Sequence, residues 1–87
     1  MTLNENIVLY PVMTEKAMNL IESENKLTFI VDLKANKYKV KRAVEELYDV
    51  KVEEINLLIN SKGLKKAFIK LNPEYKASDL AIRLGMF

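Results

Sequence analysis

The feature that most constrains the fold is an apolar stripe with helical spacing between residues 37 and 48. Its members recur every three or four residues and are Val40, Ala43, Val44, Leu47 and Tyr48. Asn36 precedes the segment, and its residue type favours the N-cap of a helix. A helix with one apolar side must bury it against a second layer, so the chain is predicted to form a layered domain around residues 37–48.

Segments with the two-residue period of β-strands lie on both sides of this helix. Residues 26–32 alternate, and residues 52–60 and 64–71 form a predicted hairpin around the turn residues 61–63. The residues expected to face the core are Leu27, Phe29, Val31, Ile55, Leu57, Ile59, Ala67, Ile69 and Leu71. The pattern indicates strands that are each buried on one face.

The remaining elements are shorter. Residues 7–10 form an extended run that ends at Pro11, and Thr14 has the residue type of an N-cap for a helix behind it. Ser78 is expected to cap a last helix, which Gly85 stops. The predicted order is strand, helix, strand, helix, strand, strand, helix. This order favours a single α+β domain over residues 1–87 with a mostly antiparallel four-stranded sheet and three helices.

Composition argues against most enzyme classes. The chain has no Cys and no His, which removes the thiolate nucleophile, the commonest general base and the commonest metal ligands. With two glycines it has no glycine-rich phosphate loop. No apolar run approaches the roughly 18 residues that a membrane span needs. We therefore expect a cytoplasmic binding protein without cofactor, metal site or membrane insertion.

The net charge of +2 conceals two basic clusters. The first, called here the α-cluster, holds five positive charges and no acid within residues 34–42: Lys34, Lys37, Lys39, Lys41 and Arg42. It coincides with the predicted start of the helix, where cations oppose the helix dipole by a few tenths of a kcal/mol each. An external anion bound by the helix start and the lysines would explain this arrangement, and phosphate is the usual one. The alternative is a solubilising face in which Lys41 and Arg42 pair with acids one turn on.

The second basic cluster, called here the β-cluster, lies within residues 61–70. Its cations are Lys62, Lys65, Lys66 and Lys70. If Ala67, Ile69 and Leu71 face the core, then the opposite face of the strand carries Lys66, Phe68 and Lys70. An exposed aromatic ring between lysines is typical of surfaces that stack bases and hold phosphates. The alternative is that a helix covers Phe68 and the lysines are simply solvated.

Several longer motifs resemble a known family. The segments are YPVMTEKAMNLIE from Tyr10, NKLTFIVDLKANKYKVKRAVEELYDVKVEEINLLI from Asn25 and KGLKKAFIKL from Lys62. They resemble the large-subunit ribosomal protein family numbered L-twenty-three, and the ending SDLAIRLGMF is similar to its archaeal form.

This resemblance implies a small ferredoxin-like (α/β-plait) domain that binds large-subunit rRNA beside the polypeptide exit tunnel. It also implies two kinds of protein partner: the neighbouring ribosomal protein L-twenty-nine, and signal-recognition or other nascent-chain factors. Among the residues, it implies rRNA contact for Thr14, Lys16, Lys37, Lys41, Lys65, Lys66 and Lys70, and factor docking for Glu15.

A second function stays open at this stage. A stand-alone ferredoxin-like RNA- or protein-binding module would use the acidic segment 43–60, with a net charge of −4, as its partner surface.

Overall fold

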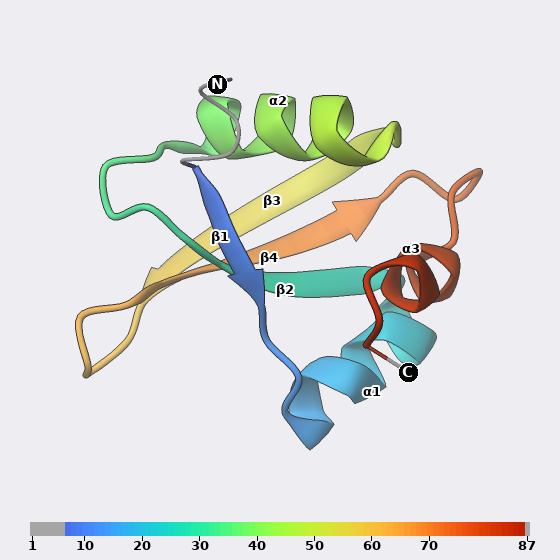
Figure 1. The fold of residues 1–87 in the computed structure, drawn as a ribbon, viewed down its shortest axis with the longest axis horizontal. Helices are drawn as coiled ribbons and strands as arrows, with labels where there is room; N and C mark the ends of the chain where they lie inside the picture. Colours follow the sequence, from blue (N-terminus) through green and yellow to red (C-terminus); the bar gives the residue numbers. More distant parts are fainter. Residues whose placement is uncertain (1–6, 87) are drawn as a thin grey trace.

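The computed structural model describes residues 7–86, and its elements follow the predicted order (Figure 1). The elements are β1 (Val8–Pro11), α1 (Glu15–Glu24), β2 (Lys26–Val31), α2 (Lys37–Tyr48), β3 (Val52–Ile59), β4 (Lys65–Leu71) and α3 (Ala77–Arg83).

The four strands form one sheet in the order β1-β2-β4-β3, and each neighbouring pair is antiparallel. Since β2 and β3 both run antiparallel to β4, they are parallel to each other, and α2 connects them across β4. Three helices and this open sheet make an α+β fold consistent with a ferredoxin-like plait. The predicted fold class is confirmed.

One face of the sheet carries the core. Ile69 of β4 lies opposite Leu27 of β2 and Ile55 of β3, and Ala67 lies opposite Phe29. Leu27, Phe29, Ala67 and Ile69 have no solvent-accessible surface. Full burial of a large apolar side chain contributes about 1.5–3 kcal/mol, so this face dominates the stability of the domain.

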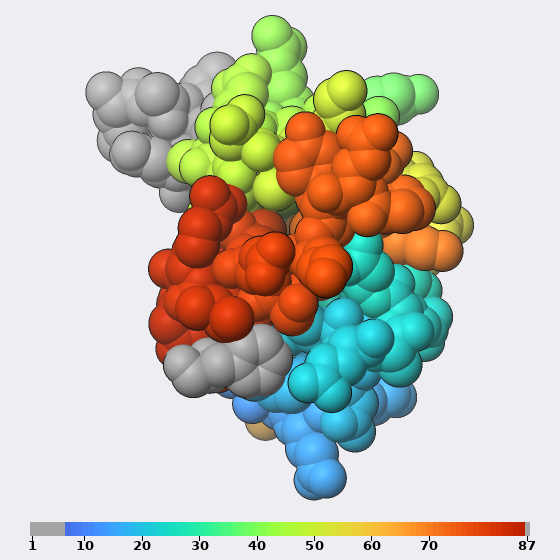
Figure 2. Space-filling model, turned by 90° about the vertical axis from the view of Figure 1, so that its right-hand side faces the viewer, coloured from blue at the N-terminus to red at the C-terminus, as the bar shows by residue number. Residues whose placement is uncertain are grey.

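All three helices contribute to this core. Its helical members are Ile21, Val40, Ala43, Val44, Ala77, Leu80 and Ala81. Tyr48 at the end of α2 stacks on Phe29 with ring centroids 5.9 Å apart, and burial raises the pKa of its phenol. Arg83 of α3 donates from Nη2 to the backbone oxygen of Tyr48 at 2.7 Å. The segment that leads from β4 into α3 lies between the end of α2 and the helices α1 and α3, in orange in Figure 2.

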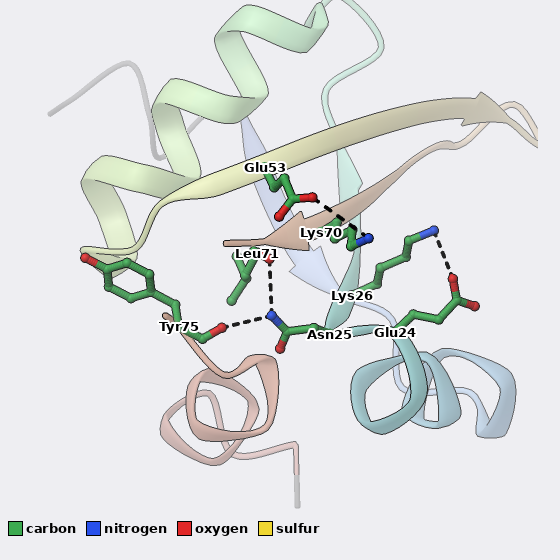
Figure 3. A network of polar contacts seen from close by, with 7 residues as sticks. All are labelled: Glu24, Asn25, Lys26, Glu53, Lys70, Leu71 and Tyr75. Carbon is green, nitrogen blue, oxygen red and sulfur yellow. Dashed lines mark hydrogen bonds and ion pairs between the residues drawn. The ribbon is translucent and has the colours of Figure 1, made fainter. Parts of the chain in front are cut away.

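Asn25 joins three elements at one point (Figure 3). It ends α1 in the left-handed conformation, with φ of 57°. Its Nδ2 donates to the backbone oxygens of Leu71 and Tyr75 at 3.2 and 2.9 Å. Its Oδ1 accepts from the backbone N–H of Ala77 at 2.7 Å. A single side chain thus connects the end of α1, the end of β4 and the start of α3.

Several local predictions were wrong. β2 was expected to be buried on one face, but Thr28 and Ile30 on its other face are each only 3% exposed.

The cap of α3 and the burial of Ile59 were also predicted wrongly. Ser78 does not cap α3, because the helix begins at Ala77 and its N-cap residue, Lys76, makes no side-chain cap bond. The distant Asn25 binds the first N–H of this helix instead. Ile59 was expected to face the core but is 58% exposed. It pairs with Lys65 next to the hairpin turn, which projects beyond the helices in Figure 1.

We predict that Asn25→Gly lowers the free energy of unfolding by about 2–3 kcal/mol, because three partly buried backbone groups lose their partner. Glycine tolerates the left-handed conformation, so the loss reports the side-chain hydrogen bonds. Asp49→Gly is the matched control, since Asp49 ends α2 with φ of 54°. Urea unfolding should show a change below about 1 kcal/mol there. Equal effects of the two substitutions would contradict this role of Asn25.

Candidate nucleic-acid interface

The α-cluster lies on the exposed side of the first half of α2. Lys37, Lys39, Lys41 and Arg42 belong to the helix, and Lys34 precedes it; all five are exposed. Asn36 caps the helix as predicted, since its Oδ1 accepts from the N–H of Lys39 at 2.9 Å. The first turn of α2 contains no acidic residue. The positive end of the helix dipole and the lysines therefore act in the same direction, toward an anion.

The acids of α2 have structural partners. Glu46 Oε1 lies 3.2 Å from Nε of Arg42, as the i, i+4 spacing predicted, but the Arg42 side chain is 81% exposed. Such a surface pair contributes only about 0–1 kcal/mol, so Arg42 can exchange it for a phosphate at little cost. Glu45 accepts from the N–H of Val52 at 2.9 Å and so connects α2 to β3. Its carboxylate stabilises the turn between these two elements.

The β-cluster divides between two faces of the sheet. Lys65 points to the helix side, where its Nζ donates to the backbone oxygens of Leu33 and Ala35 at 3.1 and 2.7 Å. These carbonyls precede α2, so Lys65 fastens β4 to the loop that carries Lys34. Lys62 is exposed in the hairpin turn, and its N–H donates to Asn60 Oδ1 at 2.9 Å.

Lys66, Phe68 and Lys70 lie on the sheet face opposite the core, as predicted, and each is partly buried. Phe68 has Thr28 and Asn56 as its neighbours on the two adjacent strands. The Nζ of Lys70 lies 4.0 Å from Oε1 of Glu53 (Figure 3). Lys26 lies directly opposite Lys70 on β2, and its Nζ is 3.3 Å from Oε1 of Glu24. Carboxylates thus partly balance the charge at one end of this face, and RNA contact there stays a prediction.

The residues at the start of α1 lie apart from the α-cluster. Thr14 Oγ1 accepts from the N–H of Ala17 at 3.2 Å, so the side chain caps α1. Glu15 and Lys16 follow in the first turn and are exposed. Figure 1 shows α1 at the opposite end of the molecule from α2. The structure therefore presents Glu15 on a separate surface.

Neither a metal-binding group of side chains nor a membrane-spanning helix is found in the part of the chain that the structure describes. Across residues 7–86, no group of three acidic side chains is placed to hold a metal ion. None of the helices in that range is long and apolar enough to cross a bilayer. A shallow groove beside the end of α2 is lined by Lys41 and Lys51 but also by Glu45 and Asp49, so its charge favours neither anions nor cations.

Comparison with known proteins shows the family of this chain. A family model described as ribosomal protein L23 matches residues 6–79. The large ribosomal subunit protein uL23 of Methanococcus aeolicus is 51% identical over 82 residues, which is 94% of this chain and 95% of that relative. The chain belongs to the ribosomal protein L23 family. The family match spans both basic clusters and the start of α1, and the resemblance seen in the sequence motifs is confirmed.

Sequence reasoning missed Tyr38 and one role of Lys65. Lys65 was predicted to contact RNA, and its ammonium group also holds two backbone oxygens, which no local pattern indicated. Tyr38 was not singled out, although it lies between Lys37 and Lys39 and its side chain is 85% exposed. The signal for Tyr38 was present, because an aromatic residue outside the apolar stripe of a helix must face solvent.

We predict that Lys65→Met lowers the free energy of unfolding by about 1–2 kcal/mol, because the oxygens of Leu33 and Ala35 lose a charged donor. Lys62→Met removes the same charge from the exposed hairpin turn, where the backbone makes the hydrogen bond. It should change stability by less than about 0.5 kcal/mol. Parallel urea titrations of the two variants measure the difference, and equal stabilities would exclude an anchoring role for Lys65.

Proposed function

We propose that this protein is a structural, non-catalytic component of the large ribosomal subunit in the cytoplasm, and that it binds large-subunit rRNA. The observation that carries the proposal is the α-cluster: five exposed cations with no acid in the first turn of α2. Membership of the ribosomal protein L23 family supports the same partner. The residues proposed to contact rRNA are Thr14, Lys16, Lys34, Lys37, Lys39, Lys41, Arg42, Lys62, Lys65, Lys66, Phe68 and Lys70.

We further propose that the protein lies beside the polypeptide exit tunnel and contacts other proteins there. The family resemblance implies contact with ribosomal protein L-twenty-nine and with nascent-chain factors such as signal-recognition components. Glu15 is the residue proposed for factor docking, because it is exposed at the start of α1, away from the basic clusters. Met13, two residues before it, is 60% exposed and adds apolar surface to that region.

The second candidate is a stand-alone RNA- or protein-binding module. Exposed acids on β3, Glu53 and Glu54, favour it, because they give one edge of the sheet a negative surface. Cosedimentation through a high-salt wash distinguishes the two candidates. A ribosomal component stays with large subunits during the wash, whereas an independent module stays in the supernatant. The second result would overturn the proposed function.

We predict a steep salt dependence of RNA binding. If about six of the cations contact phosphates, counterion release lowers the affinity roughly a thousandfold between about 50 and 200 mM salt. Filter binding of the full chain to purified large-subunit rRNA over this range gives the slope. A response that is flat in salt would mean that the clusters do not hold phosphates.

We also predict that Phe68→Ala lowers RNA affinity by about 1–3 kcal/mol and leaves the salt slope unchanged, because a stacked ring is lost but no charge. Lys66→Ala on the same face should lower the slope by roughly 0.7–0.9 through the loss of one phosphate contact. Urea unfolding of Phe68→Ala is the control. A stability loss near 3–5 kcal/mol with full RNA affinity would assign Phe68 to packing alone.

A further inference from the structure

Tyr38 is the exposed aromatic residue that the fold does not explain. Its side chain is 85% exposed, and no other large hydrophobic side chain among residues 7–86 is more exposed. It is the second residue of α2, on the side of the helix away from the buried Val40, Ala43 and Val44. A ring in this position contributes almost nothing to the core, and tyrosine forms helices less well than the lysines beside it.

Cations surround this ring. Lys41 and Arg42 follow Tyr38 by three and four residues, which places them on the same side of α2. Lys37 and Lys39 flank it along the chain. Phosphate groups held by these side chains would lie around the ring. The bases of the same nucleotides would then lie close to the ring.

We infer that Tyr38 stacks on an unpaired base of the RNA that the α-cluster binds. The inference rests on the proposed function and adds a class of ligand to it: RNA with at least one base outside a duplex. In a duplex the base faces are covered by neighbouring bases, and only an unpaired base offers a face to an aromatic ring. Such stacking accepts any base, since each has a flat π-surface.

Charge favours RNA over a protein as the occupant. The surface around Tyr38 is positive. Arg42 is paired with an acid, but that acid is Glu46 on the next turn of the helix. A nucleic acid supplies one negative charge per nucleotide next to a flat base, and so matches both parts of this surface.

The Tyr38 surface also differs from the Phe68 surface. Phe68 is partly buried between Thr28 and Asn56, and the neighbouring Lys70 has a carboxylate 4.0 Å away. Tyr38 is almost free of protein contacts. A base can therefore reach either side of its ring without rearrangement of the domain.

The first test measures the affinity of the full chain for purified large-subunit rRNA. Tyr38→Ala should weaken binding about 5- to 150-fold with an unchanged salt slope. Tyr38→Phe, which keeps the ring, should bind within about twofold of the original chain. Ile82→Ala is the matched control, because Ile82 is 61% exposed on α3 outside the basic clusters. It should leave affinity unchanged.

The second test uses fluorescence. The chain contains no Trp, so the Tyr38→Trp variant carries a single indole probe. Oligouridine should quench this probe on binding, because its unpaired bases can stack on the indole. A fully paired RNA duplex should quench it far less at equal saturation.

The outcomes separate this inference from the proposed function. If the original chain does not bind rRNA, the proposed function fails. If Lys39→Ala weakens binding and Tyr38→Ala does not, only the stacking inference fails. If Tyr38→Ala leaves rRNA affinity intact but weakens incorporation into large subunits, Tyr38 contacts a neighbouring protein and the inference is overturned.

Discussion

The register of β4 between β2 and β3 is the constraint on which the rest of the structure depends. Ile69 lies opposite both Leu27 and Ile55, so two strands hold β4 in one alignment. Because side chains alternate along a strand, a slip by one residue would bury Lys66 and Lys70 and expose Ala67 and Ile69. The packing that forms the core thus also decides which cations reach the opposite face, where Lys66, Phe68 and Lys70 are proposed to contact RNA.

The charge pattern of α2 lowers the stability of the helix itself. Lysines at the helix start oppose the dipole, and the last turn carries no basic residue to balance them. Other interactions hold the helix in place: the Asn36 cap, the buried Val40, Ala43 and Val44, and Glu45, which accepts from Val52 N–H at 2.9 Å. Because packing and caps stabilise α2, the dipole and the lysines stay available for an external anion.

Local patterns in the sequence predicted the order of elements and the core face of β2 and β4, because the periods of helices and strands are properties of neighbouring residues. They did not predict that Thr28 and Ile30, on the other face of β2, are also buried. Contacts between distant residues were not predictable. Asn25 binds Ala77 N–H across 52 residues, so no local signal identified the cap of α3, and Ser78 was chosen in error. Ile59 has the alternation of a core residue, but the hairpin extends past the helices that would cover it. The sequence does not distinguish Lys65 from the neighbouring lysines, because only the folded chain brings the loop before α2 next to it.

The fold places the two clusters on different faces of the sheet and brings them near each other at one end of it. The α-cluster lies on a helix packed against the core face, whereas Lys66, Phe68 and Lys70 lie on the opposite face. The loop before α2 and the start of β4 meet where Lys65 Nζ donates to Leu33 and Ala35. If the proposed rRNA contacts both clusters, it reaches two faces of the domain that meet at this end of the sheet. An RNA loop or junction with unpaired bases adapts to two such faces more easily than a straight duplex, which is costly to bend.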